Sequence, residues 1–336
     1  MVTPDVRHEA PEGLLTAALA EGPVLLDGGL STELEARGHD VSSALWSARL
    51  LLDDPAAVVA AHAAFARAGA RVLTTVSYQA TLPGLLAAGL DRTSAERAIT
   101  SSVDLARQGL ALAGAAGWVA GSVGPYGAHL ADGSEYTGAY LSAGQSTGAS
   151  AGEGRVDERA LRAHHRPHLQ LLAQAGADVI ACETLPGAAE VEALLPELEE
   201  LGVPAWVSLS AVVDEAGVVR TRRGEPVGPV LAAAAGVGCV LGVGVNCLDP
   251  AAVLPALLQA GAAVPAREAV LVAYPNSGEA WDAAARTWSG AGTDADGAGD
   301  EGVAAWVAAG ARLVGGCCRV RPHHTARTAA VLTSLG

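Results

Sequence analysis

The chain alternates eight short apolar runs with Ala- and Leu-rich helical segments, and no other feature limits its fold as strongly. The runs are continuously rich in Val, Leu and Ile, which is typical of parallel strands covered on both faces. They cover residues 24–29, 71–78, 118–123, 177–184, 205–213, 239–246, 269–275 and 312–316. Eight such units in 336 residues predict an α/β fold, a single (β/α)8 TIM barrel domain over residues 1–336, rather than a doubly wound sheet.

Proline and acidic residues mark where several helices begin. Asp54-Pro55 and Asp249-Pro250 each place an N-cap carboxylate before a proline at the first helical position, and Pro322 suits the same role. Residues 227–245 carry no charge, but their glycines and Pro229 predict a buried helix, a turn and a buried strand instead of a membrane-spanning helix.

Two low-complexity stretches, residues 142–154 and 289–300, interrupt the pattern after the third and seventh predicted strands. Their Gly-, Ser-, Ala- and Asp-rich composition predicts flexible loops. Loops that follow barrel strands lie on the C-terminal face of the sheet, where barrel enzymes bind their substrates. These loops are therefore either solvated linkers or lids over a site.

The charge balance narrows the classes of partner. The 21 basic residues, all of them Arg, and the 36 acidic residues give a formal net charge of −15, which argues against nucleic acid and against an anionic membrane. The lack of Lys excludes Schiff-base and P-loop chemistry. Residues 1–12 lack the layout of a signal peptide, and an odd number of cysteines, five, favours a reducing compartment. We therefore expect a cytoplasmic protein that acts on small molecules.

Three cysteines carry the clearest chemical signal. Cys247 ends the sixth predicted strand, and Cys317 and Cys318 follow the eighth, so a barrel brings their thiols to the same face. Adjacent cysteines on a regular strand would point to opposite faces, but a turn at Gly315-Gly316 lets both face one ion. Three thiolates at about 2.3 Å would hold Zn²⁺ with its fourth position open. Inert buried cysteines and a Cys317–Cys318 disulfide are the alternatives, since no CxxC motif is present.

A zinc ion with three thiolate ligands has a restricted chemistry. The site already carries a formal charge of −1, so it polarises carbonyl groups poorly. It is well suited to bind a fourth thiol, remove its proton and keep it nucleophilic near pH 7. This chemistry suggests alkyl transfer to a thiol substrate.

Eight motifs lie in order along the chain, each near the end of a predicted strand. They are DGGLSTELE (27–35), TVSYQAT (75–81), GSVGPYG (121–127), DGSEY (132–136), CET (182–184), GVNC (244–247), YPNSGE (274–279) and GGCCR (315–319). Through them the chain resembles the zinc-dependent homocysteine S-methyltransferases over nearly its whole length. The stretch from 121 to 136 is most similar to the branch that uses S-methylmethionine as the methyl donor.

The resemblance implies roles for residues on the predicted C-terminal face. Cys247, Cys317 and Cys318 would be the zinc ligands, and Asp27 and Glu183 would bind the ammonium group of homocysteine, as suits two carboxylates facing a cation. Alternatively, Asp27 caps the turn that follows it, and Glu183 accepts hydrogen bonds from a helix start.

Asn246, beside the zinc ligand Cys247, either orients a ligand or the substrate or stabilises the turn in which it lies.

The methyl donor is a sulfonium cation, which needs an aromatic face or a carboxylate nearby. Tyr78, Tyr126, Tyr136 and Tyr274 all follow predicted strands and are candidates, with ordinary packing as the alternative. Glu135 is a candidate for holding the amino-acid end of the donor, or is a solvated loop charge.

The resemblance also implies a reaction. Homocysteine would bind zinc as a thiolate and attack the methyl carbon of S-methylmethionine in line, which gives two molecules of methionine. A thioether leaving group needs no general acid, so positioning in a dry barrel mouth accounts for much of the catalysis. S-adenosylmethionine or betaine as donor, a zinc hydrolase, and a non-catalytic zinc protein are the competing interpretations.

Histidines elsewhere suggest no second site. His164, His165 and His168 have metal-compatible spacing, but no acidic residue completes a known motif and Pro167 should interrupt the helix, so we expect a solvated cluster. His62 falls on an apolar helix face, which predicts a core histidine with its hydrogen bonds satisfied.

Overall fold

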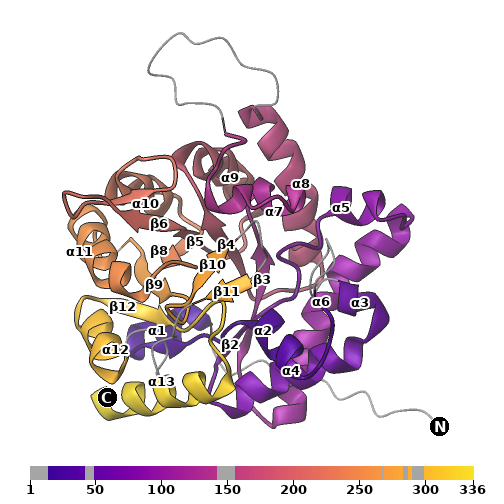
Figure 1. Ribbon diagram of the computed structural model, residues 1–336, viewed down its shortest axis with the longest axis horizontal. Helices are drawn as coiled ribbons and strands as arrows, with labels where there is room; N and C mark the ends of the chain where they lie inside the picture. Colours follow the sequence, from indigo (N-terminus) through magenta and orange to yellow (C-terminus); the bar gives the residue numbers. More distant parts are fainter. Residues whose placement is uncertain (1–13, 42–48, 142–155, 267, 283–286, 290–298) are drawn as a thin grey trace.

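Eight parallel strands form a barrel in the computed structural model, which describes residues 14–41, 49–141, 156–266, 268–282, 287–289 and 299–336 (Figure 1). The strands pair in the order β1-β12-β9-β8-β5-β4-β3-β2. Their bounds are Val24–Leu25 (β1), Val72–Thr74 (β2), Trp118–Val123 (β3), Val179–Leu185 (β4), Ala205–Leu209 (β5), Val240–Asn246 (β8), Val270–Tyr274 (β9) and Ala311–Val314 (β12). A bridge between Leu26 and Val72 joins the two ends of this sheet, so the predicted (β/α)8 fold is confirmed.

Helices surround the barrel (Figure 1). One or more helical segments follow each barrel strand, and eight longer helices, α4, α6 and α8 to α13, form the outer layer. The α-helices are Leu15–Glu21 (α1), Leu30–Ala36 (α2), Leu50–Asp53 (α3), Pro55–Arg67 (α4), Leu82–Ala87 (α5), Arg92–Ala113 (α6), Tyr126–Leu130 (α7), Glu158–Gln174 (α8), Ala188–Leu201 (α9), Val227–Ala235 (α10), Val253–Ala263 (α11), Gly299–Ala308 (α12) and Pro322–Leu335 (α13). The 3₁₀ turns Ser134–Tyr136 (η2) and Pro250–Ala252 (η3) also lie in the described part of the chain.

The predicted helix starts are confirmed. The Asp54 carboxylate accepts a hydrogen bond from the Ala57 N–H at 3.1 Å, and α4 begins at Pro55. Asp249 caps η3 in the same way, and α13 begins at Pro322. These caps satisfy backbone donors that would otherwise lack a partner, so each helix starts where the sequence indicates.

The barrel interior changes from apolar to polar along the strands. Near the N-terminal ends of the strands the inward side chains form an apolar cluster with Trp118 and Trp206, and Leu15 and Leu19 of α1 join it and cover that end. Side chains on a strand alternate between its two faces, which decides which residues point into the barrel. The inward residues nearer the C-terminal ends are polar. They include Thr74, Ser122, Glu183, Ser208 and Asn246. The fold therefore places its polar layer at the end where barrel enzymes act.

Gly244 lets β8 lie close to β9. A Cβ atom at this position would be 1.9 Å from the carbonyl oxygen of Val272, a distance that the backbone cannot accommodate. The glycines of residues 242–244 thus serve close packing inside the barrel.

The fifth predicted strand, residues 205–213, is really two elements. The barrel strand β5 ends at Leu209, and Ala211–Val213 (β6) pairs antiparallel with Val219–Thr221 (β7) as a hairpin on the C-terminal face. Val212 and Val213 are exposed, so the continuous apolar run did not mark one buried strand. A second hairpin, Ala280–Asp282 (β10) with Thr287–Ser289 (β11), follows β9.

The uncharged stretch 227–245 forms α10 and β8, as predicted. None of the helices in the described part of the chain has the length and apolarity needed to cross a membrane. The predicted loop 142–154 lies outside the described residues, as does most of 289–300. Their role as lids stays a prediction.

The prediction of a solvated histidine cluster was wrong. His164, His165 and His168 are all buried, because α8 continues through Pro167 and presents them to α7 and α9. His165 Nε2 lies 2.9 Å from the carboxylate of Glu190, which is itself buried. His62 is buried as expected, but neither of its ring nitrogens has a hydrogen-bond partner within the described residues.

Candidate functional site

The three cysteines singled out in the sequence meet at the C-terminal end of the barrel. Cys318 Sγ lies 3.8 Å from Cys247 Sγ and 3.9 Å from Cys317 Sγ. Sulfur atoms bound tetrahedrally at about 2.3 Å from one zinc ion are about 3.8 Å apart, so the spacing fits the metal. The same distances exclude a disulfide between these residues. Among the described residues this is the one group of His, Cys and acidic side chains close enough to share a metal ion.

The backbone bends sharply at each ligand. Cys247 has a positive φ of 51°, which is uncommon for a residue with a Cβ atom. Gly316 precedes the adjacent cysteines, and a Cβ atom there would lie 2.2 Å from Cγ1 of Val320. The turn from Cys317 to Val320, closed by a 3.1 Å hydrogen bond from the Val320 N–H, brings both neighbouring thiols to the cluster. The predicted turn beside Gly315-Gly316 is therefore present.

The three thiols of the cluster differ in how readily they ionise. The pKa of Cys247 lies well below its ordinary value because the thiols of Cys317 and Cys318 hydrogen-bond to its sulfur, and the pKa values of those two thiols are raised in turn. One sulfur of the cluster thus ionises ahead of the other two, as suits a site that exchanges protons for a metal ion. By contrast, burial raises the pKa of Cys182, which faces the helices instead of the barrel interior.

A cavity of about 570 Å³ opens beside the three sulfurs. Most of the residues predicted for substrate binding line it: Asp27, Tyr78, Glu135, Tyr136, Glu183 and Tyr274. Two predicted residues do not: Asn246 lies behind the wall, and Tyr126 lies elsewhere. The cavity therefore joins a sulfur cluster, two buried carboxylates and several tyrosines in one space.

Asp27 lies just beyond β1 with its carboxylate held by Thr74. The Thr74 N–H donates to Oδ2 at 2.8 Å, and the Thr74 hydroxyl donates to Oδ1 at 2.9 Å. Burial raises the pKa of Asp27 to about 8, with the nearby Glu183 adding to the rise and the bonds from Thr74 opposing it. A cation placed here would relieve the cost of a buried negative charge.

Glu183 is the second carboxylate of the cavity. The hydroxyl of Ser122 donates to its Oε1, and burial raises its pKa to about 7. Tyr274 lies alongside, with its hydroxyl oxygen 2.9 Å from Trp206 Nε1 and 2.6 Å from Ser208 Oγ. Tyr274 is thus fixed by hydrogen bonds from the barrel interior, and it lines the cavity near the carboxylate.

Asn246 connects the two halves of the site from behind. Its Oδ1 accepts hydrogen bonds from the Thr184 N–H at 2.7 Å and from Ser208 Oγ at 2.9 Å. Its Nδ2 donates to Thr184 Oγ1 at 2.8 Å. Of the two roles left open by the sequence, these contacts match stabilisation of the backbone, here the irregular end of β4 that carries Glu183 and the turn at Cys247.

The tyrosines divide between the cavity and the core. Tyr136 Oη lies 3.8 Å from Cys247 Sγ, and the half-buried Tyr78 and the buried Glu135 lie in the same wall. Tyr126, by contrast, begins α7, and its ring packs 4.8 Å from that of His164 and 5.5 Å from that of Tyr140. Tyr126 is therefore not part of the cavity wall. Its position after a strand did not fix the direction of its side chain.

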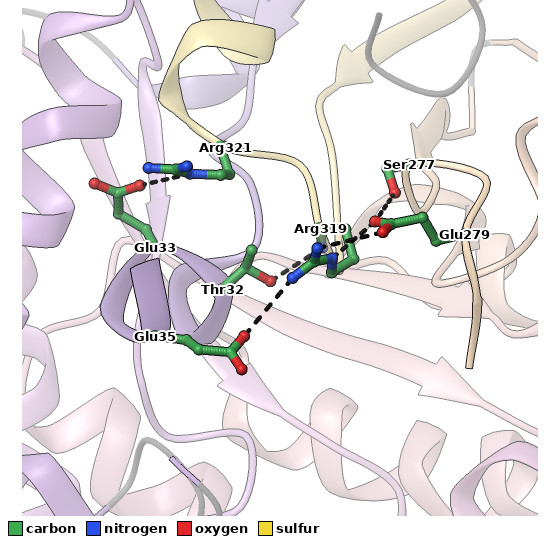
Figure 2. A network of polar contacts seen from close by, with 7 residues as sticks. All are labelled: Thr32, Glu33, Glu35, Ser277, Glu279, Arg319 and Arg321. Carbon is green, nitrogen blue, oxygen red and sulfur yellow. Dashed lines mark hydrogen bonds and ion pairs between the residues drawn. The ribbon is translucent and has the colours of Figure 1, made fainter. Parts of the chain in front are cut away.

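Two arginines near the cluster were not singled out in the sequence. Arg222, at the end of the β6–β7 hairpin, donates from Nε to Ser210 Oγ at 3.0 Å. Burial lowers the pKa of Arg222, and the electrostatic effect of the nearby Cys247 and Tyr136 opposes this lowering. Reading residues 205–213 as one strand concealed this hairpin. Arg319 follows Cys318 and forms an ion pair with Glu279 (Figure 2). Arg319 and Glu279 lie in the motifs GGCCR and YPNSGE, and membership of these motifs was the only sequence signal for the pair.

Comparison with known proteins agrees with the geometry. A family model described as homocysteine S-methyltransferase matches residues 24–332. The chain belongs to the homocysteine S-methyltransferase family. It is therefore a methyltransferase. The homocysteine S-methyltransferase of Escherichia coli (strain K12) is 42% identical over 308 residues, which cover 89% of this chain and 92% of that protein.

Other members of the family are similar over comparable lengths. Homocysteine S-methyltransferase 3 of Arabidopsis thaliana is 35% identical, with 97% of this chain and 94% of that protein covered. The crystal structure of the E. coli homocysteine methyltransferase MmuM in its metallated form has a TM-score of 0.76 at 38% identity, covering 93% of this chain and 98% of that one. A metal is thus a feature of that relative, and the three-cysteine cluster of this chain fits one.

Proposed function

We propose that this enzyme transfers a methyl group from S-methylmethionine to the sulfur of L-homocysteine and forms methionine. The observation that carries the proposal is the convergence of three thiols, at the spacing of a tetrahedral metal site, on a cavity that also contains two buried carboxylates. An open metal position next to paired carboxylates suits a substrate with a thiol at one end and an ammonium group at the other.

Cys247, Cys317 and Cys318 would hold a zinc ion. When bound, zinc supplies a Lewis acid that lowers the pKa of a fourth, exchangeable thiol and keeps its sulfur nucleophilic near neutral pH. Thiolate ligands favour zinc over the hard cations Mg²⁺ and Ca²⁺. The sulfur spacing of 3.8 to 3.9 Å supports the choice of zinc, because it leaves room for tetrahedral bonds of about 2.3 Å.

Asp27 and Glu183 would bind the ammonium group of homocysteine. Both carboxylates are buried with raised pKa values, so each is costly to ionise until a cation arrives. Thr74 and Ser122 hold them in fixed positions by hydrogen bonds. This arrangement orients the substrate with its thiol toward the cysteines, and orientation of this kind contributes much of the rate of a displacement reaction.

Tyr78, Tyr136 and Glu135 would surround the methyl donor. Tyrosine faces and a carboxylate stabilise a sulfonium cation, and all three residues line the cavity beside Cys247. In the transfer, a new bond forms between the homocysteine sulfur and the methyl carbon, and the electrons of the broken bond stay on the departing thioether. The reaction joins an anion and a cation into neutral products, so a cavity that excludes water favours it.

We also place the enzyme in the reducing environment of the cytoplasm. All five of its cysteines are free thiols, and the proposed chemistry requires three of them to stay reduced.

A purified-enzyme assay tests the proposal. Methionine formation from L-homocysteine is followed with S-methylmethionine, S-adenosylmethionine or betaine, each with and without a chelator. The proposal predicts the highest kcat/KM with S-methylmethionine, two methionines formed per homocysteine consumed, loss of activity with chelator and recovery with added Zn²⁺. Faster turnover with another donor would reassign the donor, and no methionine from any donor would refute the methyl-transfer proposal.

A further inference from the structure

Arg319 immediately follows the metal-ligand candidate Cys318, and two carboxylates flank its guanidinium (Figure 2). Nε donates to Glu279 Oε2 at 2.7 Å, and Nη2 donates to Glu279 Oε1 at 3.2 Å. This two-point geometry is specific to arginine and is stronger than a single ion pair. On the other side, Nη1 lies 3.7 Å from Glu35 Oε2 of α2.

The same arginine is also fixed through its backbone. Its N–H donates to Thr32 Oγ1 at 3.0 Å, and its φ angle is 67°, in the left-handed region where glycine is most at ease. Arg319 is the third residue of the turn from Cys317 to Val320, a position at which turns with positive φ favour glycine. The chain thus has an arginine where the backbone conformation alone would favour glycine. This indicates that the arginine side chain has a structural or functional role.

The loop that carries Glu279, residues 277–279, makes a second contact with the turn that contains Cys317 and Cys318. The Ser277 N–H donates to the carbonyl oxygen of Cys318 at 3.1 Å, and the Ser277 hydroxyl donates to Glu279 Oε2 at 3.0 Å. Residues 277–279 therefore hold both the backbone of one ligand candidate and the side chain of the next residue. They lie between β9 and β10, at the base of the β10–β11 hairpin.

Arg319 lines the cavity, so binding of a substrate carboxylate is the obvious alternative role. Its contacts argue against that role, because Nε and Nη2 already donate to Glu279 and Nη1 faces Glu35. A nearby pair of the same chemistry, Arg321 with Glu33 at 3.3 Å, provides a natural comparison, since it joins α2 to the start of α13 and does not involve the loop 277–279 (Figure 2).

We propose that Arg319 is a positioning residue: its ion pair with Glu279 fixes the Cys317–Cys318 turn so that both thiols stay directed at one metal ion. The pair makes the loop 277–279 part of the support of the metal site. This inference rests on the proposed function, because it takes the ion to be bound by the three cysteines. Partners that orient metal ligands in this way typically contribute about 10- to 100-fold to metal affinity.

The test measures the rate of zinc release from the loaded enzyme to a chromophoric chelator in excess. Arg319→Gly, Glu279→Gln and the double variant are compared with the unmodified chain, with Arg319→Lys as the conservative variant and Arg321→Gln as the matched control. We expect release about 10-fold faster or more in the two single variants, a smaller increase with Lys, and a change of less than about 2-fold in Arg321→Gln. The double variant should release zinc no faster than either single variant, because the two residues act as a pair.

Arg319→Gly separates side chain from backbone, since glycine relaxes the left-handed turn while removing the ion pair. Unchanged or slower release in this variant and in Glu279→Gln would overturn the inference. A raised KM for homocysteine with unchanged zinc release would also overturn it, in favour of substrate binding. If the unmodified chain bound no zinc, both the proposed function and the inference would fail. If it bound zinc but the variants released zinc at the unmodified rate, the inference alone would fail, so the two failures are distinguishable. Circular dichroism confirms folding, and Glu279→Gln, which leaves the turn sequence intact, keeps the test valid if Arg319→Gly does not fold.

Discussion

Asn246 and Thr184 exchange two hydrogen bonds across β5, from Thr184 N–H to Asn246 Oδ1 at 2.7 Å and from Asn246 Nδ2 to Thr184 Oγ1 at 2.8 Å. Thr184 follows the carboxylate Glu183, and Asn246 precedes the thiol Cys247. Both Thr184 and Cys247 have positive φ, 62° and 51°, so the pair joins two strained backbone segments, the irregular end of β4 and the turn after β8, that carry different parts of the site.

Replacing Asn246 with Ala should weaken both backbone segments. The Thr184 N–H and hydroxyl would lose their buried partner, and we expect the free energy of unfolding in urea to fall by about 2 kcal/mol. The KM for homocysteine should rise in the same variant, because Glu183 and Cys247 lose their common support. Thr184→Ser retains both hydrogen bonds and is the control. An Asn246→Ala enzyme with unchanged stability and KM would show that the pair has no such role.

Neutral replacements of the two carboxylates should weaken homocysteine binding selectively. Asp27→Asn and Glu183→Gln keep the shape of the cavity but remove a charge that would face the ammonium group. We expect the KM for homocysteine to rise about 10-fold or more in each, which corresponds to loss of at least one charge-assisted hydrogen bond. The KM for the methyl donor should change little. Equal effects on both substrates would place these residues in a different role.

The pH dependence of homocysteine binding follows from the raised pKa values. Glu183 and Asp27, with pKa values of about 7 and 8, ionise between about pH 6 and pH 9 in the ligand-free enzyme. Only the ionised forms attract an ammonium group, so the KM for homocysteine should fall as pH rises from 6 to 8.5. Steady-state kinetics over this range check the slope, which should be shallower in Asp27→Asn. A KM independent of pH would contradict the assignment.

The stability of the ligand-free enzyme should change in the opposite direction. A carboxyl with a raised pKa binds its proton more tightly in the folded state than in the unfolded state. This stabilising contribution is complete below about pH 4 and is lost as pH rises through 7 and 8, where Glu183 and Asp27 ionise. Thermal unfolding in the presence of homocysteine should therefore show a larger ligand-induced rise in Tm at pH 8.5 than at pH 6. A larger rise at pH 6 would be inconsistent with binding by ionised carboxylates.

Removal of one predicted ligand should remove the metal without unfolding the barrel. Cys317 lies on the rim of the cavity, so we expect Cys317→Ala to retain the circular dichroism of the unmodified chain while bound zinc falls from about one to below about 0.1 per chain. Cys182→Ala is the matched control, because that thiol is buried among apolar groups facing the helices. Full zinc retention in Cys317→Ala would refute the three-cysteine site.

His62 should make folding sensitive to acid. Burial lowers its pKa from 6.5 to about 3, so its contribution to stability is present above pH 6.5 and is lost as pH falls toward 3. Between pH 6.5 and pH 5 this loss amounts to roughly 1–2 kcal/mol. Urea unfolding of His62→Leu should show a shallower acid dependence, whereas His323→Leu, at an exposed position on α13, should not. Identical profiles for His62→Leu and the unmodified chain would contradict this account.

The sequence supports the barrel and the sulfur cluster because both depend on periodicity and on strand ends. Continuous apolar runs define parallel strands, and parallel strands bring their C-terminal ends to one face, so the meeting of Cys247 with Cys317 follows from topology alone. The same reasoning places Asp27 and Glu183 in the cavity.

Side-chain direction beyond a strand end could not be predicted in the same way. Tyr126 and Tyr136 both follow β3, yet only Tyr136 lines the cavity, because each direction depends on the local helix and turn. His164 is buried since α7 covers it, a contact between segments that no local pattern encodes. The Arg319–Glu279 pair likewise joins residues 40 positions apart.

The most direct test of the whole account is zinc X-ray absorption spectroscopy of the metal-loaded enzyme before and after addition of L-homocysteine. The account predicts three sulfur ligands at about 2.3 Å with one oxygen or nitrogen ligand, changing to four sulfur ligands when homocysteine binds. Fewer than three sulfur ligands in the free enzyme, or a sulfur count that homocysteine leaves unchanged, would contradict it.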